Sequence, residues 1–442
     1  MSLSRSKAKR LVDDVLAEAS FGDLRVHITS SERGHLRYGA GRPTTSGDVD
    51  GVSVAVTASK DGRTATVTGS RTDKPAIAEL VRRAEGLSAL SPEDPEYMPP
   101  LGASKLPRVS AEDKAVAGLS SAKRAELVGR AIGRAEGDGV SAAGILEHQR
   151  RTTVVATRAG LFAHHTKTQV SLSSTCRTPD GTGSARSGFV SHALAGLVPE
   201  RLVKDAADRA KLSQLPIGRK PGRYTVILAP QAVADLLQYL VGALSSRRAE
   251  EGRSAFSRMG GGTQIGEKLF DPRIELWSDP ADKANPADPF DGQGRPQSRV
   301  TWIKGGVLEA LHTSRYWAAN KGIEDRPQPS SLHMAGGADD LDALVAGADK
   351  AVLISRLWYI RMLDPQQLLV TGLTRDGTFW VEGGKIVQPV RNFRFNDSPL
   401  NLLRKVVALG QPQRAGLSTG RVTVVPPLVV SDFNLASVSD AV

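Results

Sequence analysis

The sequence predicts an α+β fold with an N-terminal α/β unit, a middle segment and a C-terminal domain of mostly antiparallel β-sheet. Three observations predict it. Helical apolar periodicity flanks short alternating segments near the N-terminus, prolines punctuate residues 92–107, and the last part of the chain is rich in strand-like segments separated by glycine pairs. The predicted domains are 1–110, 111–215 and 216–442. A chain of 442 residues is long enough for two or three domains with a large core.

The N-terminal unit combines two helices with antiparallel strands. Apolar residues at helical spacing predict helices over 7–19 and 75–87, and Asp73 is the expected N-cap of the second. A polar loop is predicted over 39–48. The alternating segments that predict strands are 24–29, 49–57 and 64–69. The proline-punctuated stretch that follows is expected to be a linker.

The middle segment and the start of the C-terminal domain show the same two kinds of pattern. Helices are predicted over 120–136 and 197–212, and a meander of strands lies between them. The turn from Thr157 to Gly160 joins two of those strands, since glycine permits a positive φ. A strand over 224–228 then leads directly into a helix.

Composition narrows the class of protein. The net charge is +11 and the pI is about 9.8, so a nucleic-acid partner must be weighed. Lys and Arg are spread along the whole chain, without a recognisable nucleic-acid-binding motif, which favours a basic surface over a nucleic-acid site. No apolar run reaches the ~20 residues of a membrane helix. The single cysteine, Cys176, suits a reducing compartment, so a cytoplasmic location without membrane partners is expected.

Seven short stretches, taken in order, carry a resemblance to a known family. Pro289-Phe-Asp-Gly-Gln-Gly-Arg-Pro296 is similar to that family's PFDDEG segment, and the helix after the strand 224–228 occupies the place of its metal-binding helix. The stretches are 157–161, 229–237, 289–296, 303–308, 313–322, 368–373 and 379–386. On these segments the chain resembles the TldD/PmbA (TldE) metallopeptidase family.

The resemblance has a specific exception. The active subunit of the family carries His-Glu-x-x-x-His, and the matching positions here are Gln238, Tyr239 and Ala243. The family's late cysteine ligand is also missing, because no cysteine follows Cys176. The resemblance therefore implies a TldE/PmbA-type subunit that holds no metal or other cofactor. Its implied partners are a zinc-bearing TldD-like subunit, in a heterodimer, and the unfolded peptides that the pair cuts.

The chemistry of the three side chains agrees with that implication. A hydrolytic zinc site needs about three protein donors and an open position for water. An amide oxygen is a weak donor, alanine has none, and tyrosine is a poor base near neutral pH because its ordinary pKa is about 10. The residues also fit a plainer interpretation, in which the leucines of this helix face a core and Gln238 and Tyr239 lie on the other side.

Four further residues are candidates for contacts with a substrate or a partner. Phe290, Asp291 and Arg295 lie in a loop with two glycines, which can bring backbone close to an extended peptide. His312 precedes a hairpin and helix that the resemblance places near the substrate channel. A structural turn and a packing histidine are the alternatives. Two other functions stay open: an autonomous hydrolase that uses His312 with an acid, or a nucleic-acid or gyrase-associated binding protein.

Overall fold

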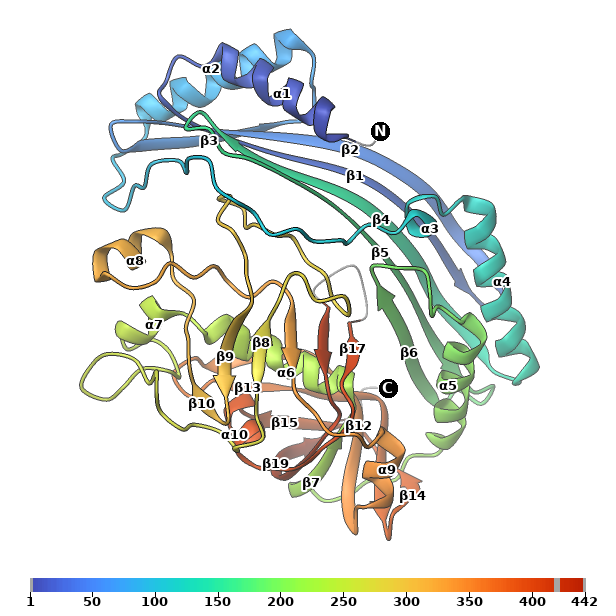
Figure 1. Cartoon of the computed structure of the whole chain (residues 1–442). Coiled ribbons are helices and arrows are strands. Elements are labelled where there is room, and N and C mark those ends of the chain that lie inside the picture. Colours follow the sequence, from blue (N-terminus) through green and yellow to red (C-terminus); the bar gives the residue numbers. More distant parts are fainter. Residues whose placement is uncertain (1–2, 417–421, 440–442) are drawn as a thin grey trace.

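A six-stranded antiparallel sheet of unusually long strands arches over the rest of the molecule (Figure 1). The computed structural model describes residues 3–416 and 422–439. The strand order is β3-β2-β1-β4-β5-β6. The strands are β1 (Asp23–Gly39), β2 (Arg42–Lys60), β3 (Arg63–Gly69), β4 (Ser141–Thr157), β5 (Phe162–Arg177) and β6 (Ser184–Ser191). The predicted N-terminal unit (1–110) and middle segment (111–215) therefore contribute strands to one and the same sheet.

Helices cover the outer face of this sheet in two groups. The helices are α1 (Arg5–Glu18), α2 (Lys74–Leu90), α3 (Lys114–Ala117), α4 (Ser121–Gly137) and α5 (Pro199–Leu212). Helices α1 and α2 bury their apolar sides on one end of the sheet, and α4 and α5 on the other. Asp73 caps α2 by accepting a hydrogen bond from the Ala76 backbone N–H, as predicted. All four long predicted helices of this part are confirmed.

The predicted polar loop over 39–48 is wrong. Strand β1 runs to Gly39, a tight turn follows at Ala40 and Gly41 with positive φ at both, and β2 begins at Arg42. The first part of β2 is exposed on both faces, so it lacks the alternation of apolar and polar residues that reveals a strand. Backbone pairing with β1 over its whole length holds it in the sheet instead.

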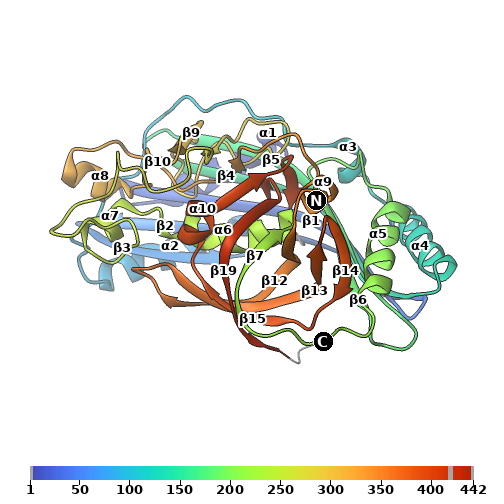
Figure 2. The ribbon, with the colours of Figure 1, turned by 90° about the horizontal axis from the view of Figure 1, so that it is seen from below.

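The C-terminal part contains two further sheets around one core (Figure 2). One sheet has the order β12-β7-β19-β15-β13-β14 with β16 beside β19, and the other β10-β9-β8-β11-β18-β17. The first comprises β7 (Gly222–Leu228), β12 (Lys350–Asp364), β13 (Leu369–Glu382), β14 (Lys385–Pro389), β15 (Phe393–Asp397), β16 (Val406–Leu409) and β19 (Leu428–Val438). The second comprises β8 (Leu276–Ser278), β9 (Val300–Lys304), β10 (Val307–Leu308), β11 (Leu332–Met334), β17 (Gln413–Ala415) and β18 (Thr423–Val425).

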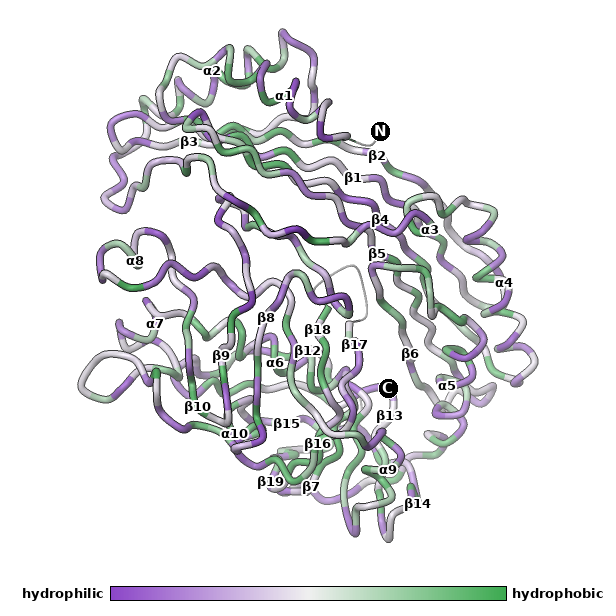
Figure 3. Tube along the Cα trace, viewed as in Figure 1, coloured by the Kyte–Doolittle hydropathy of each residue, from purple (hydrophilic) through white to green (hydrophobic). Residues whose placement is uncertain are grey.

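Five helices accompany these sheets within the described part of the chain. They are α6 (Pro230–Ala243), α7 (Ser246–Glu250), α8 (Arg315–Lys321), α9 (Leu341–Ala346) and α10 (Pro399–Arg404). Figure 3 shows apolar segments gathered at β7, β16 and β19. Between the described strands of these two sheets, all pairings are antiparallel except β7 with β12 and β11 with β18, so the predicted α+β class with a mostly antiparallel C-terminal part is confirmed. Every helix within the described ranges is too short or too polar to cross a bilayer.

Candidate functional site

Helix α6 is the element that the sequence resemblance aligns with a metal-binding helix. It follows β7 without a loop, and Pro230 occupies its first turn, where a missing N–H costs nothing. Its apolar side is buried in the C-terminal core, as predicted. The buried residues of the helix are Ala232, Val233, Leu236, Leu237, Leu240, Val241 and Ala243.

Of the three positions that the resemblance aligns with the zinc motif, two make hydrogen bonds with the protein and the third has no polar side-chain atom. The Gln238 amide donates to the Asp235 carbonyl within the same helix, at 2.9 Å. The Tyr239 hydroxyl donates to the Ile360 carbonyl on β12 at 2.8 Å, and burial raises the pKa of this phenol. Ala243 is 8% exposed and offers no donor atom. A zinc ion does not fit this set of side chains.

The end of α6 is bonded to His312. The His312 backbone N–H donates to the Leu244 carbonyl at 2.8 Å, and the His312 carbonyl accepts from the Ser246 backbone N–H at 3.0 Å. Ala243 therefore lies one residue from a backbone contact of His312. The structure brings together two candidates that are about 70 residues apart in the sequence.

The loop from Pro289 to Pro296 is a turn clasped by Asp291 and Arg295. One carboxylate oxygen of Asp291 accepts from the backbone N–H groups of Gln293 and Arg295 at 2.9 and 3.0 Å. The other accepts from the Arg295 Nε at 2.7 Å. The Arg295 guanidinium also donates to the Thr313 carbonyl at 3.0 Å, which ties the turn to the segment that follows His312. Both side chains thus hold the loop in shape.

The same loop rests on the inner face of the long sheet. Phe290 is 2% exposed and packs with Val155, Leu161 and Ala163 of the β4–β5 hairpin. A Cβ atom at Gly294 would lie 2.2 Å from a Leu161 methyl carbon, and φ there is +89°. Only glycine permits so close an approach in that conformation.

All four predicted contact residues line one cavity of about 570 Å³ between the sheet and the C-terminal part. Phe290, Asp291, Arg295 and His312 form its C-terminal wall. The sheet contributes His27 from β1, Arg151 and Thr153 from β4, and Lys167 from β5. Gln238, Tyr239 and Ala243, which the resemblance aligns with the zinc motif, are not among the described residues that line this cavity.

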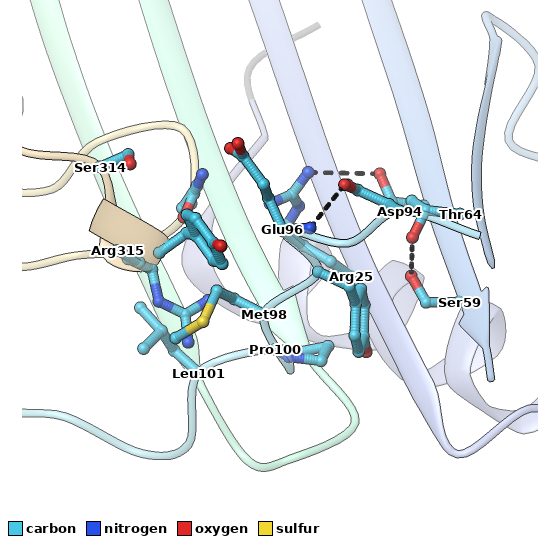
Figure 4. A pocket seen from close by; sticks show the side chains of 14 residues that line it. Arg25, Ser59, Thr64, Asp94, Glu96, Met98, Pro100, Leu101, Ser314 and Arg315 are labelled. Carbon is cyan, nitrogen blue, oxygen red and sulfur yellow. Dashed lines mark hydrogen bonds between the residues drawn. The ribbon is translucent and has the colours of Figure 1, made fainter. Parts of the chain in front are cut away.

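Two smaller cavities continue it on either side. One of about 310 Å³ shares Ser314 with it and lies between β1, the 94–101 segment and the start of α8. Figure 4 shows Met98 and Leu101 beside Arg315 there, with Arg25 nearer the sheet. The other, of about 320 Å³, shares Arg151 and Lys167 and lies at the opposite end. Together the three cavities form a row along the inner face of the sheet, which we call the interdomain groove.

The electrostatics of the groove favour neutral imidazoles. Burial, with Arg295 and Arg248 nearby, lowers the pKa of His312 to about 4. Burial and the neighbouring cations Arg151 and Arg25 also lower the pKa of His27. Both rings are therefore uncharged near neutral pH, and each can donate or accept one hydrogen bond.

The hydroxyl groups near His312 are already engaged. The Ser314 Oγ accepts the backbone N–H of Trp317 at 3.1 Å as the N-cap of α8, and the Thr313 Oγ1 donates to the Glu324 carbonyl at 3.1 Å. Asp291 is held by Arg295. The arrangement suits binding of polar groups more than acid–base catalysis. Within the described ranges, no three His, Cys, Asp or Glu side chains lie together so that they could hold a metal ion.

Sequence reasoning missed the sheet's own contribution. The Lys167 ammonium donates to Asp288 at 2.7 Å. Desolvation opposes ionisation of Asp288, but Lys167, Arg151 and His165 together lower its pKa. Asp235 was missed as well: burial raises its pKa to about 6, while Leu357 N–H and Gln231 donate to its carboxyl. The alternation of side chains between the two faces of β4 and β5 was the sequence signal that could have placed Arg151 and Lys167 on one face of the sheet.

Comparison with known proteins identifies the family. Residues 221–437 match the PmbA/TldA metallopeptidase C-terminal domain, and residues 104–214 match the central domain. The chain belongs to the PmbA/TldD metallopeptidase family. Metalloprotease PmbA of Escherichia coli O157:H7 is 23% identical over 261 residues, which are 57% of this chain and 56% of that protein. The match thus spans about half the length of this PmbA relative.

Solved structures show the same fold at low identity. A proposed DNA gyrase modulator from Thermotoga maritima superposes with a TM-score of 0.84 and 18% identity, covering 97% of this chain and 99% of that one. TldE from Thermococcus kodakarensis gives 0.81 and 16% identity, with 97% and 99% coverage. The PmbA/TldD fold therefore extends over nearly the whole chain, including the N-terminal part that the sequence matched only by its pattern of elements.

Proposed function

We propose that this chain is the non-catalytic subunit of a TldD/TldE-type metallopeptidase heterodimer that degrades or processes unfolded peptides. The observation that carries the proposal is the state of α6. Gln238 is bonded within its own helix, Tyr239 is bonded to β12, and Ala243 has no donor atom. In this proposal the partner, a TldD-like chain with an intact His-Glu-x-x-x-His motif, supplies the zinc and the hydrolytic step.

The contribution of this chain is to enclose and align the peptide. The interdomain groove presents backbone, imidazole and guanidinium groups, which suit an extended polypeptide. We place Phe290, Asp291, Arg295 and His312 along the peptide path or at its border with the partner. We also propose a cytoplasmic location, since a reducing compartment suits a chain whose one cysteine is a buried free thiol.

Co-expression with a TldD-like chain tests the proposal. We expect a stable one-to-one complex in size-exclusion chromatography with light scattering. The complex should cut a fluorescent unfolded peptide, and either chain alone should cut it far more slowly. A chelator should abolish the activity of the complex. Chelator-resistant cleavage by this chain alone would establish the autonomous hydrolase instead, and failure to associate with the TldD-like chain would contradict the heterodimer.

A histidine substitution in the same complex tests the groove. His312→Asn keeps a neutral side chain that can both donate and accept hydrogen bonds, and removes the ring from the cavity wall. We expect a raised KM with a nearly unchanged kcat, because lost uniform binding acts on KM alone. An unchanged KM would remove His312 from the peptide path. Leu212→Ala, at a residue that is 50% exposed on α5, is a control that should leave both constants unchanged.

A further inference from the structure

The cavity at the far end of the interdomain groove has the composition of an anion site. We call it the basic pocket: it measures about 320 Å³ and lies between strands β4 and β5, the end of β6, and residues from the C-terminal part. Its polar lining comprises Gln149, Arg151, Lys167, Thr168, Gln169, Ser191, His192, Asn285, Ser330 and Arg414. Among the described residues that line it there is no Asp or Glu.

Three cations reach the basic pocket from three separate strands, and they differ in how far they are neutralised. Lys167 is paired with Asp288, which lines the neighbouring cavity. Arg414 donates through its Nε to the Ala284 carbonyl, a neutral acceptor. Arg151 lines both cavities but has no ion pair within 4 Å in the described part of the chain. Two carboxylates act on these three cations, Asp288 on Lys167 and Arg151 and Asp282 on Arg414, so the cations of the basic pocket outnumber them by one.

Several polar atoms of the pocket are buried without a hydrogen-bond partner. They are the Arg151 Nε, the His192 Nδ1 and the Ser330 Oγ, and they come from β4, the end of β6 and the loop before β11. A buried donor left unsatisfied carries a cost in free energy, and the cost is larger when the group is charged. A ligand that accepts hydrogen bonds at this place would recover part of that cost. Two of the three groups can donate whatever their protonation state.

The wall that leads to the pocket has the same sign of charge. Inward-facing residues alternate along β1, β4 and β5, as the register and the Phe290 contact establish. They are Arg25, His27, Thr29, Ser31, Arg33, Gln149, Arg151, Thr153, Val155, Thr157, Ala163, His165, Lys167, Gln169 and Ser171. Within these fifteen positions there are four cations and no carboxylate; Glu147, which pairs with Ser171 and faces the same way, is one inward position beyond Gln149 and outside the lining of the basic pocket. An anionic group is therefore attracted along the wall between Arg25 and Gln149.

We propose that the basic pocket binds a carboxylate of the peptide, either its free C-terminus or an Asp or Glu side chain. The choice of a peptide rests on the proposed function, whereas the sign of the charge rests on the pocket itself. Arg151 and Arg414 are the principal contacts, because a planar guanidinium can hold a carboxylate through two parallel hydrogen bonds. The volume admits a terminal residue, and the rest of the peptide would extend along the interdomain groove.

Fluorescence anisotropy on the full chain tests this proposal. The probes are unfolded peptides of one sequence, labelled at the N-terminus: one with a free C-terminal carboxylate, one amidated, and one amidated with an internal Gln replaced by Glu. We expect at least tenfold tighter binding for one or both carboxylate peptides than for the neutral amide. Which of the two gains affinity identifies the source of the carboxylate.

Substitution of the two arginines locates the binding site. The double variant Arg151→Gln with Arg414→Gln should remove the tenfold preference. The single variant Arg151→Lys, which keeps the positive charge, should retain part of it. Arg82→Gln with Arg83→Gln is the matched control, because it also removes two positive charges, from exposed side chains of α2 on the outer face. Melting temperatures of all variants confirm that they fold. A double variant that fails to fold is replaced by each single substitution.

Two results would overturn the proposal. Equal affinity for carboxylate and amide peptides would exclude a carboxylate site, and an undiminished preference in the arginine variants would place it elsewhere. Single-stranded DNA that binds more tightly than the peptides, and loses affinity in the same variants, would assign the pocket to nucleic acid. The anisotropy assay uses the chain alone, so its result can be interpreted even if the heterodimer does not form. Likewise, a failure of the carboxylate proposal does not affect the co-expression test of the heterodimer.

Discussion

Replacing Phe290 by alanine tests whether the loop at 289–296 joins the C-terminal part to the long sheet. The ring is 2% exposed and packs on Val155, Leu161 and Ala163. Phe→Ala substitutions at such buried sites cost about 3–5 kcal/mol, the lost transfer energy plus the cavity left behind. We expect a loss in this range for Phe290→Ala and a smaller loss for Phe290→Leu, which keeps part of the apolar volume.

Urea unfolding followed by two probes gives the measurement. All five tryptophans, at positions 277 to 380, lie in the C-terminal part, so their fluorescence reports that part, whereas circular dichroism reports both. We expect the midpoint for Phe290→Ala to fall in both signals. A loss below about 1 kcal/mol would refute the reasoning. Truncation of so deeply buried a ring destabilises by more than that whenever the contact between the two parts is present.

Three other substitutions or probes follow from burial. Burial raises the pKa of Asp235 to about 6, so its contribution to stability is greatest below pH 4 and is lost as the pH rises through 6. The loss amounts to roughly 3 kcal/mol of unfolding free energy. Asp235→Asn should remove this pH dependence from urea unfolding measured across the same pH range. Burial raises the pKa of Cys176 to about 11, so an aromatic disulfide reagent at pH 8 should label it only after unfolding, and rapid labelling of the native chain would contradict the structure. Gly144→Ala would place a Cβ atom 2.0 Å from the Ser173 carbonyl oxygen and should destabilise by at least ~2 kcal/mol, whereas Gly129→Ala, in open space on α4, should stabilise by ~1 kcal/mol in the same thermal assay.

Local patterns were sufficient for the helices and insufficient for the length of the strands. The helices of the N-terminal and middle parts follow from apolar periodicity and from caps such as Asp73. The first half of β2 could not be predicted, because both of its faces are exposed and only pairing with β1 makes it a strand. A second pairing joins β1 to β4, which begins about 100 residues after β1 ends, and so unites the predicted N-terminal unit and middle segment in one sheet.

The candidate site was partly accessible to sequence reasoning. The loop with Asp291 and Arg295 and the distant His312 were singled out, and the fold brings them to one cavity. Arg151 and Lys167 were not, because an isolated cation in an alternating segment looks like a solvated strand residue. Their significance depends on the register of β4 with β5 and on which face meets the C-terminal part, and both are tertiary information.

Zinc content is the most direct test of the central claim that this chain lacks the family's catalytic metal site. The protein should be purified alone, without chelator, and its zinc measured per chain by elemental analysis. We expect a value near zero, because Gln238, Tyr239 and Ala243 offer neither the donors nor the base. A matched TldD-like chain purified in the same way should hold about one zinc ion, given its motif. Stoichiometric zinc in this chain, retained after dialysis, would contradict the account and make the chain an enzyme in its own right.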